Sequence, residues 1–114
     1  MTSPWHDSNL AADLPVGGLR RVELEGTAVC VGRTAVGWVA FQDECTHEEC
    51  SLADGELDGA VIVCPCHSSE FDIRTGDVLS PPALEPLPIY DALENAGRVE
   101  GRLAPPPAAA DAAH

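Results

Sequence analysis

Apolar and polar residues alternate with a period of two through much of the chain. Val22 and Leu24 alternate with charged residues, and Phe71 and Ile73 do the same. This period is typical of half-buried β-strands. Short apolar runs predict further strands at 28–31, 38–41, 60–63, 78–79 and 87–90, and a last strand is predicted at 98–103. No stretch keeps a helical period for more than a turn or two, so the pattern predicts an all-β fold of small antiparallel sheets.

The two ends of the chain lack this pattern. Residues 1–15 carry Trp5, Leu10 and Leu14 among polar residues, which predicts an irregular arm with apolar anchors, Trp5 packing on the sheet. The end APPPAAADAAH is of low complexity and predicts a flexible tail. We therefore expect one domain over 1–103 and a Pro/Ala-rich tail over 104–114.

The charge restricts the choice of partners. Nineteen acidic residues against six arginines, with no lysine, give a formal net charge of −13. Such a protein is a poor ligand for nucleic acid or an anionic membrane. The sequence has neither the pattern of a signal peptide nor about 20 consecutive apolar residues, so we expect a cytoplasmic protein that does not enter the membrane.

Two short clusters of cysteine and histidine stand out in the middle of the chain. Cys45 and His47 are two positions apart, Cys64 and His67 are three apart, and sixteen residues separate the pairs. Each pair fits on one loop, so two loops could bind one metal cofactor. The turn signals Asp54-Gly55 and Asp58-Gly59 between them predict that both loops are hairpin tips.

The ligand types leave zinc and iron–sulfur chemistry open. Zinc fingers usually take their cysteines from one half and their histidines from the other, whereas each half here supplies one of each. This mixed order favours a two-iron cluster with both cysteines on one iron and both histidines on the other, the Rieske ligation. A structural zinc site is the alternative, and the absence of visible absorption would reveal it.

The segments CTH and CPCH, with the surrounding GELDGAVIVCPCHSSEFDIRTGDVLSPPALEPLPIYD, resemble Rieske-type ferredoxins over nearly the whole chain. The resemblance implies one Rieske 2Fe-2S cluster in a lobe of about residues 43–82. It also implies that Cys45 and Cys64 bind the buried iron and that His47 and His67 present the outer iron to solvent. A third loop, from Ser80 to Pro82, is expected to cover the cluster.

Four more residues gain an expected role from the same resemblance. Cys50 and Cys66 match positions that form a disulfide in respiratory and photosynthetic Rieske proteins, although dioxygenase-type ferredoxins commonly lack it; two free thiols are the alternative. Ser69 matches a hydroxyl that bonds a cluster sulfide in high-potential Rieske proteins. Phe71 stands where those proteins have a tyrosine that bonds a ligand thiolate, so we expect an intermediate reduction potential.

The resemblance implies an electron carrier and not an enzyme. The expected role is the ferredoxin component of an aromatic-ring-hydroxylating dioxygenase, a monomer that passes electrons from a flavin-containing ferredoxin reductase to a terminal oxygenase. The sequence offers no catalytic nucleophile and no second histidine/carboxylate cluster for a mononuclear iron. A Rieske-like small subunit of nitrite reductase and a redox-sensing Rieske protein are the alternatives.

The remaining expectations concern single side chains and surface charge. Cys30 lies in an apolar run and is expected to be a buried, unreactive thiol; His6 and His114 are expected to be exposed. Ten acids and one base, Arg74, lie between Asp43 and Asp77, so we expect a negative surface at the cluster end that guides basic partners.

Overall fold

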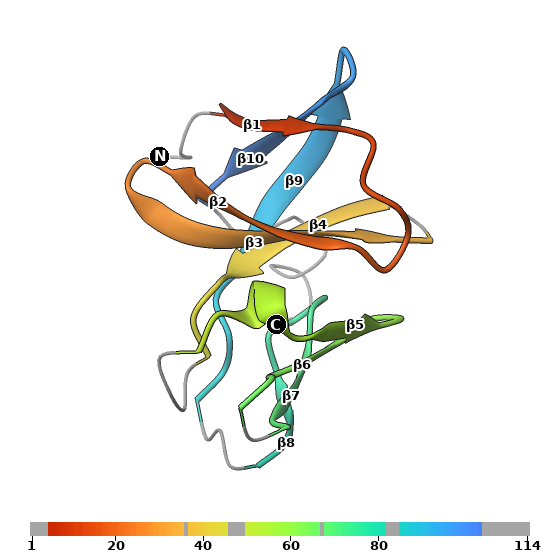
Figure 1. Ribbon diagram of the computed structural model, residues 1–114. Helices are drawn as coiled ribbons and strands as arrows, with labels where there is room; N and C mark the ends of the chain where they lie inside the picture. Colours follow the sequence, from red (N-terminus) through yellow and green to blue (C-terminus); the bar gives the residue numbers. More distant parts are fainter. Residues whose placement is uncertain (1–4, 36, 46–49, 67, 82–84, 104–114) are drawn as a thin grey trace.

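Two antiparallel sheets contain almost all of the regular structure in the computed structural model (Figure 1), which describes residues 5–35, 37–45, 50–66, 68–81 and 85–103. These described residues form, in chain order, ten strands and one 3₁₀ turn: β1 (His6–Ala11), β2 (Leu19–Leu24), β3 (Thr27–Thr34), β4 (Gly37–Gln42), η1 (Leu52–Asp54), β5 (Glu56–Asp58), β6 (Val61–Val63), β7 (Glu70–Asp72), β8 (Val78–Ser80), β9 (Ile89–Asn95) and β10 (Arg98–Arg102). The all-β prediction is confirmed. No helix in these described ranges could cross a membrane.

The larger sheet has six strands in the order β1-β10-β9-β4-β3-β2. The sheet curls so that β10 approaches β2. The approach is close at Gly101 of β10, where an added Cβ atom would lie only 2.5 Å from Leu24 Cδ1 of β2. An apolar core fills this curl and contains Leu10, Leu24, Val29, Val31, Ala40 and Val99.

The smaller sheet has four strands in the order β5-β6-β7-β8 and lies below the larger one in Figure 1. A second apolar core joins the two sheets. Phe41 of β4 and Ile89 of β9 pack there with Leu52, Ile62 and Phe71. Since this core also contains Cys45 and Cys64, the predicted ligand cysteines are held by the packing between the sheets.

Strand β1 was not predicted. Its register against β10 pairs Asp7 with Glu100 and Leu10 with Val99, with a shift between them. A β-bulge of this kind breaks the period-two alternation on which strand prediction depends. Ser8 is buried, and its Oγ donates a hydrogen bond to the Val99 carbonyl at 2.7 Å. The predicted irregular arm is therefore wrong for residues 6–11.

Strand β9 is longer than predicted and starts later, since the sequence predicted a strand at residues 87–90. It starts at Ile89 and continues to Asn95. Ile89 and Tyr90 pair with β4, and residues 91–95 pair with β10. The following turn places both Ala96 and Gly97 at positive φ, 54° and 79°, as in the tight hairpin turns that match strand twist. Residues 91–95 alternate poorly, so their strand depends on β10 rather than on their own pattern.

Three side chains outside the ligand loops test smaller predictions. Cys30 is fully buried, as predicted, and this burial raises the pKa of its thiol far above the ordinary range, which favours the protonated form. His6 was predicted to be exposed, but it is half-buried with Nε2 3.2 Å from Glu25 Oε1. Trp5 packs beneath the Arg102 guanidinium, whose carbon lies 4.6 Å from the ring centroid.

Candidate metal centre

The first ligand loop connects β4 to η1. An isolated antiparallel bridge between Glu44 and Ser51 closes it, and the Cys45 amide donates to the Cys50 carbonyl at 3.0 Å. These contacts fix both ends of the loop. The two ends of this loop are therefore paired with each other, but they do not belong to two adjacent strands of a sheet. The prediction of a hairpin tip is wrong for this loop.

The second ligand loop is the tip of the β6–β7 hairpin, as predicted. Val63 pairs with Glu70 at its base, the Cys64 amide donates to the Ser69 carbonyl at 2.8 Å, and the Ser68 amide donates to the Cys64 carbonyl at 3.1 Å. Ser68 takes a left-handed φ of 62° to close the turn. The backbone of Cys64 is thus fixed by hydrogen bonds through both its amide and its carbonyl group.

A disulfide joins the two loops through Cys50 and Cys66, whose Cα atoms are 6.5 Å apart. The bond expected from the sequence is therefore present in the structure. A second close approach lies nearby, because a Cβ atom at Gly55 would collide with the Val63 carbonyl oxygen. The segment that follows the first loop is thus packed directly against the strand that leads to Cys64.

The two predicted thiol ligands lie inside this assembly. Cys45 is 3% exposed and Cys64 is 2% exposed, and neither forms a disulfide. Buried thiols on two cross-linked loops fit the cysteine side of an iron–sulfur centre, since cysteine thiolates hold such clusters. The predicted histidine ligands His47 and His67 lie outside the described residues, as does the covering loop from Pro82 onward.

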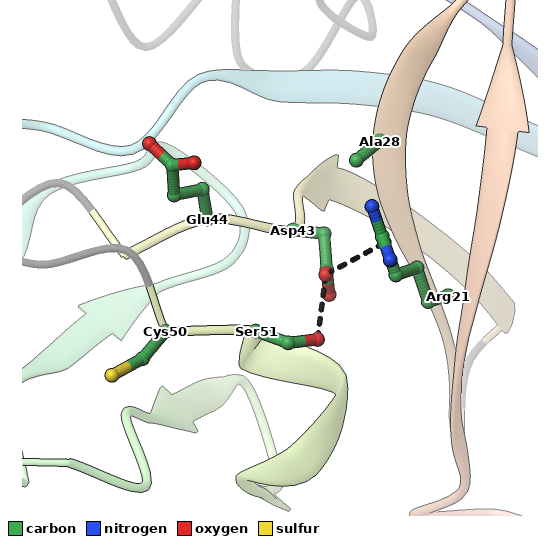
Figure 2. A pocket seen from close by; sticks show the side chains of 6 residues that line it. All are labelled: Arg21, Ala28, Asp43, Glu44, Cys50 and Ser51. Carbon is green, nitrogen blue, oxygen red and sulfur yellow. Dashed lines mark hydrogen bonds and ion pairs between the residues drawn. The ribbon is translucent and has the colours of Figure 1, made fainter.

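The negative surface expected at this end needs a correction. Asp43 is buried, and its Oδ2 lies 3.3 Å from Arg21 Nε and accepts a hydrogen bond from Ser51 Oγ at 2.6 Å (Figure 2). Asp72 accepts two hydrogen bonds from the Arg74 side chain, which lower the pKa of its carboxyl. Both carboxylates are therefore paired structural groups. Among the described acids between residues 43 and 77, those that are exposed are Glu44, Asp54, Glu56, Asp58 and Asp77.

Comparison with known families identifies the centre. The family model for the Rieske [2Fe-2S] domain matches residues 4–91, which include both ligand loops. The chain belongs to the Rieske family. The implied cofactor is one Rieske 2Fe-2S cluster, and the buried Cys45 and Cys64 thiols suit it.

Three similar proteins place this Rieske chain more closely. It is 40% identical over 91 residues to the biphenyl dioxygenase ferredoxin subunit of Pseudomonas sp. strain KKS102, covering 79% of each chain. It is 37% identical over 100 residues to ferredoxin CarAc of Metapseudomonas resinovorans, covering 87% of this chain and 94% of that one. A solved complex of reduced oxygenase and oxidised ferredoxin in carbazole 1,9a-dioxygenase matches with a TM-score of 0.80 and 34% identity, covering 90% of this chain and 95% of that one.

The contact between Asp43 of the ligand lobe and Arg21 of β2 was not predicted from the sequence. Asp43 was counted among the surface acids, because nothing in the hydrophobic pattern distinguishes a carboxylate that will be buried. Its partner Arg21 comes from β2, 22 positions earlier in the chain. The one available signal was the position of Asp43, two residues before the predicted ligand Cys45.

The two residues expected to tune the potential are both fully buried beside the second ligand loop. Ser69 follows the loop, and Phe71 packs in the core that contains Cys45 and Cys64. A hydrogen bond to a ligand or sulfide stabilises the more negative, reduced state of a metal centre. Phe71 places an aromatic ring in this core without a donor.

We predict that Phe71→Tyr raises the reduction potential by tens of millivolts. The added hydroxyl would favour the reduced state, and a tenfold preference is about 59 mV for one electron. Direct electrochemistry on the purified protein measures the shift. Phe71→Leu, which perturbs packing without a hydroxyl, is the control and should give no rise. An unchanged potential in a Phe71→Tyr protein of unchanged structure would remove the hydrogen-bond explanation.

Proposed function

We propose that this Rieske protein is the electron-carrying ferredoxin component of an aromatic-ring-hydroxylating dioxygenase system. The observation that carries the proposal is its similarity, over most of both chains, to ferredoxins of biphenyl and carbazole dioxygenase systems. The buried thiol pair on cross-linked loops supports it. The chain itself carries out no chemical reaction on a substrate.

The proposed ligands divide between the inside and the outside of the lobe. Cys45 and Cys64 would hold the inner iron, where burial excludes water from the thiolates, and His47 and His67 the outer iron. The cluster, when bound, takes up and releases one electron. Two ferric ions, two sulfides and two thiolates sum to zero charge, so reduction adds only one negative charge. Neutral imidazole ligands thus keep the potential higher than four thiolates would, roughly −150 to +300 mV in Rieske centres.

The proposed partners are those that the resemblance to dioxygenase ferredoxins implies. A flavin-containing ferredoxin reductase would supply the electron, and a terminal oxygenase would receive it, in the cytoplasm. The carbazole dioxygenase complex contains an oxygenase with its ferredoxin, which supports the second of these contacts. We propose that the carrier acts as a monomer.

Reconstitution tests this function. The protein is combined with a nicotinamide donor, a ferredoxin reductase and a terminal oxygenase from the same organism, and oxidised aromatic product is measured. Product should rise with the concentration of this protein and be absent without it. Product formed equally well without it, or none at any concentration although the protein is readily reduced, would contradict the proposed role.

We predict that association with these partners depends on salt. The ligand lobe carries exposed acids, and attraction to basic partners weakens above roughly 0.1 M salt, where the Debye length is about 10 Å. Glu48→Gln together with Glu49→Gln, beside the ligand His47, should slow electron transfer several-fold at low salt and leave the spectrum unchanged. Stopped-flow measurement over a range of salt concentrations checks this.

The matched control removes two exposed acids from the larger sheet and its N-terminal connection. Asp13→Asn together with Glu23→Gln makes the same change in net charge away from the ligand loops. This control should keep the wild-type salt dependence. Equal rates for wild type and the Glu48/Glu49 variant at every ionic strength would mean that contact at the histidine tip, and not charge, selects the partner.

A further inference from the structure

One carboxylate, that of Asp43, holds both ends of the first ligand loop. Its Oδ2 accepts from Ser51 Oγ at 2.6 Å, and its Oδ1 accepts from the Ala53 amide at 2.9 Å. The backbone of the same residue accepts from the Leu52 amide at 2.5 Å and donates to the Ala28 carbonyl at 3.2 Å. Asp43 therefore ties the start of the loop to its end and to strand β3.

This carboxylate is buried, whereas its cationic partner is not. The Asp43 side chain is 4% exposed and the Arg21 side chain 57% exposed, with Arg21 Nε 3.3 Å from Asp43 Oδ2. Figure 2 shows Arg21 and Ser51 both directed at the carboxylate, while the Cys50 sulfur points away from it. The pair borders a cavity of about 180 Å³ whose lining also includes Glu44 and Cys50.

A buried carboxylate two positions from the proposed ligand Cys45 has an electrostatic consequence. Reduction of the Rieske centre adds a negative charge, and an uncompensated anion nearby opposes it. A cation in contact with that anion cancels most of its field at the centre. The first ligand loop can thus be fixed by strong charge-assisted hydrogen bonds without a penalty on reduction.

Resting on the proposed function, we propose that Asp43 is a positioning residue for the loop that carries Cys45 and that Arg21 balances its charge and so sets the reduction potential. The positioning of the loop and the balance of charge can be tested separately. Ser51 contributes to position without charge, whereas Arg21 contributes charge from another strand.

The charge part is tested by the potential of the isolated protein near neutral pH. Arg21→Gln should lower the potential and Asp43→Asn should raise it, each by a three- to tenfold change in the equilibrium constant for reduction. The double variant should return close to wild type. Each charge change has a matched control. Arg20→Gln removes the adjacent exposed arginine on the same strand as Arg21. Asp91→Asn removes the carboxylate of the Asp91–Arg102 pair in the larger sheet. Shifts in the controls as large as those in the variants would overturn the charge balance.

The position part is tested by the rate of cluster loss to a chelator and by the line shape of the reduced-state paramagnetic signal. Ser51→Ala should speed cluster loss several-fold and broaden the signal without moving the potential, and Ser51→Thr, which keeps the hydroxyl, should restore both. Unchanged cluster loss in Ser51→Ala would overturn the positioning role. All these readouts omit reductase and oxygenase, so they can fail while the electron-carrier function stands, and that function can fail while they succeed.

Discussion

His67→Ala should abolish the Rieske absorption and the reduced-state paramagnetic signal. His67 is a proposed ligand of the outer iron, and an alanine supplies no nitrogen in its place. Because metal binding and local folding are coupled, we expect near-complete loss of bound iron rather than a shifted spectrum. Visible absorption, iron content and paramagnetic resonance of anaerobically purified protein measure the result.

His6→Ala is the matched control for this substitution. His6 lies in β1 of the larger sheet, 3.2 Å from Glu25, so its loss should leave cluster content and spectrum unchanged. A His67→Ala protein with a normal paramagnetic signal would show that the ligand assignment is wrong. A colourless wild-type protein that contains zinc would restore the zinc alternative.

Removal of the Cys50–Cys66 disulfide should destabilise the ligand lobe by about 3 kcal/mol. The bond joins residues with a sequence separation of 16, and cross-linking a loop of about 15 residues stabilises a protein by about 3 kcal/mol through the unfolded chain. Cys50→Ser together with Cys66→Ser should therefore lower the denaturant midpoint. Hydrogen exchange should increase mainly in the two ligand loops.

The single variants provide the internal control for the disulfide. A bond between two sulfurs is lost when either is removed, so Cys50→Ser and Cys66→Ser should each cost about as much as the double variant. The Cys30 thiol, fully buried and unpaired by disulfide, stays in place in all three proteins. A double variant that unfolds at the wild-type midpoint would mean that the two loops are held by packing alone.

The strands that could be predicted from the sequence are those with a local pattern of apolar and polar side chains. Val22 and Leu24 alternate with charged neighbours, and β2 forms there; the run around Phe41 becomes β4 and packs in the core between the sheets. The cysteines of the site were equally visible, since ligand chemistry restricts residue type and spacing. The disulfide depended on resemblance, because spacing alone does not decide which thiols pair.

The unpredicted part depends on contacts between distant segments. Strand β1 forms around a bulge and a Ser8 hydrogen bond to Val99, and neither leaves a local hydrophobic pattern. The burial of Asp43 requires Arg21 from β2 and the closed first ligand loop together. These contacts form only when the sheets assemble. The sequence around Ser8 or Asp43 alone therefore does not predict them.

The electron-carrier role is tested most directly by a single-turnover experiment. Protein reduced by one equivalent is mixed without oxygen with the oxidised terminal oxygenase, and the absorption of both centres is followed by stopped flow. The carrier should be reoxidised as the oxygenase is reduced, one electron for one, at a rate sufficient for steady-state turnover. A carrier that stays reduced, or transfers its electron far more slowly than the system turns over, would contradict it.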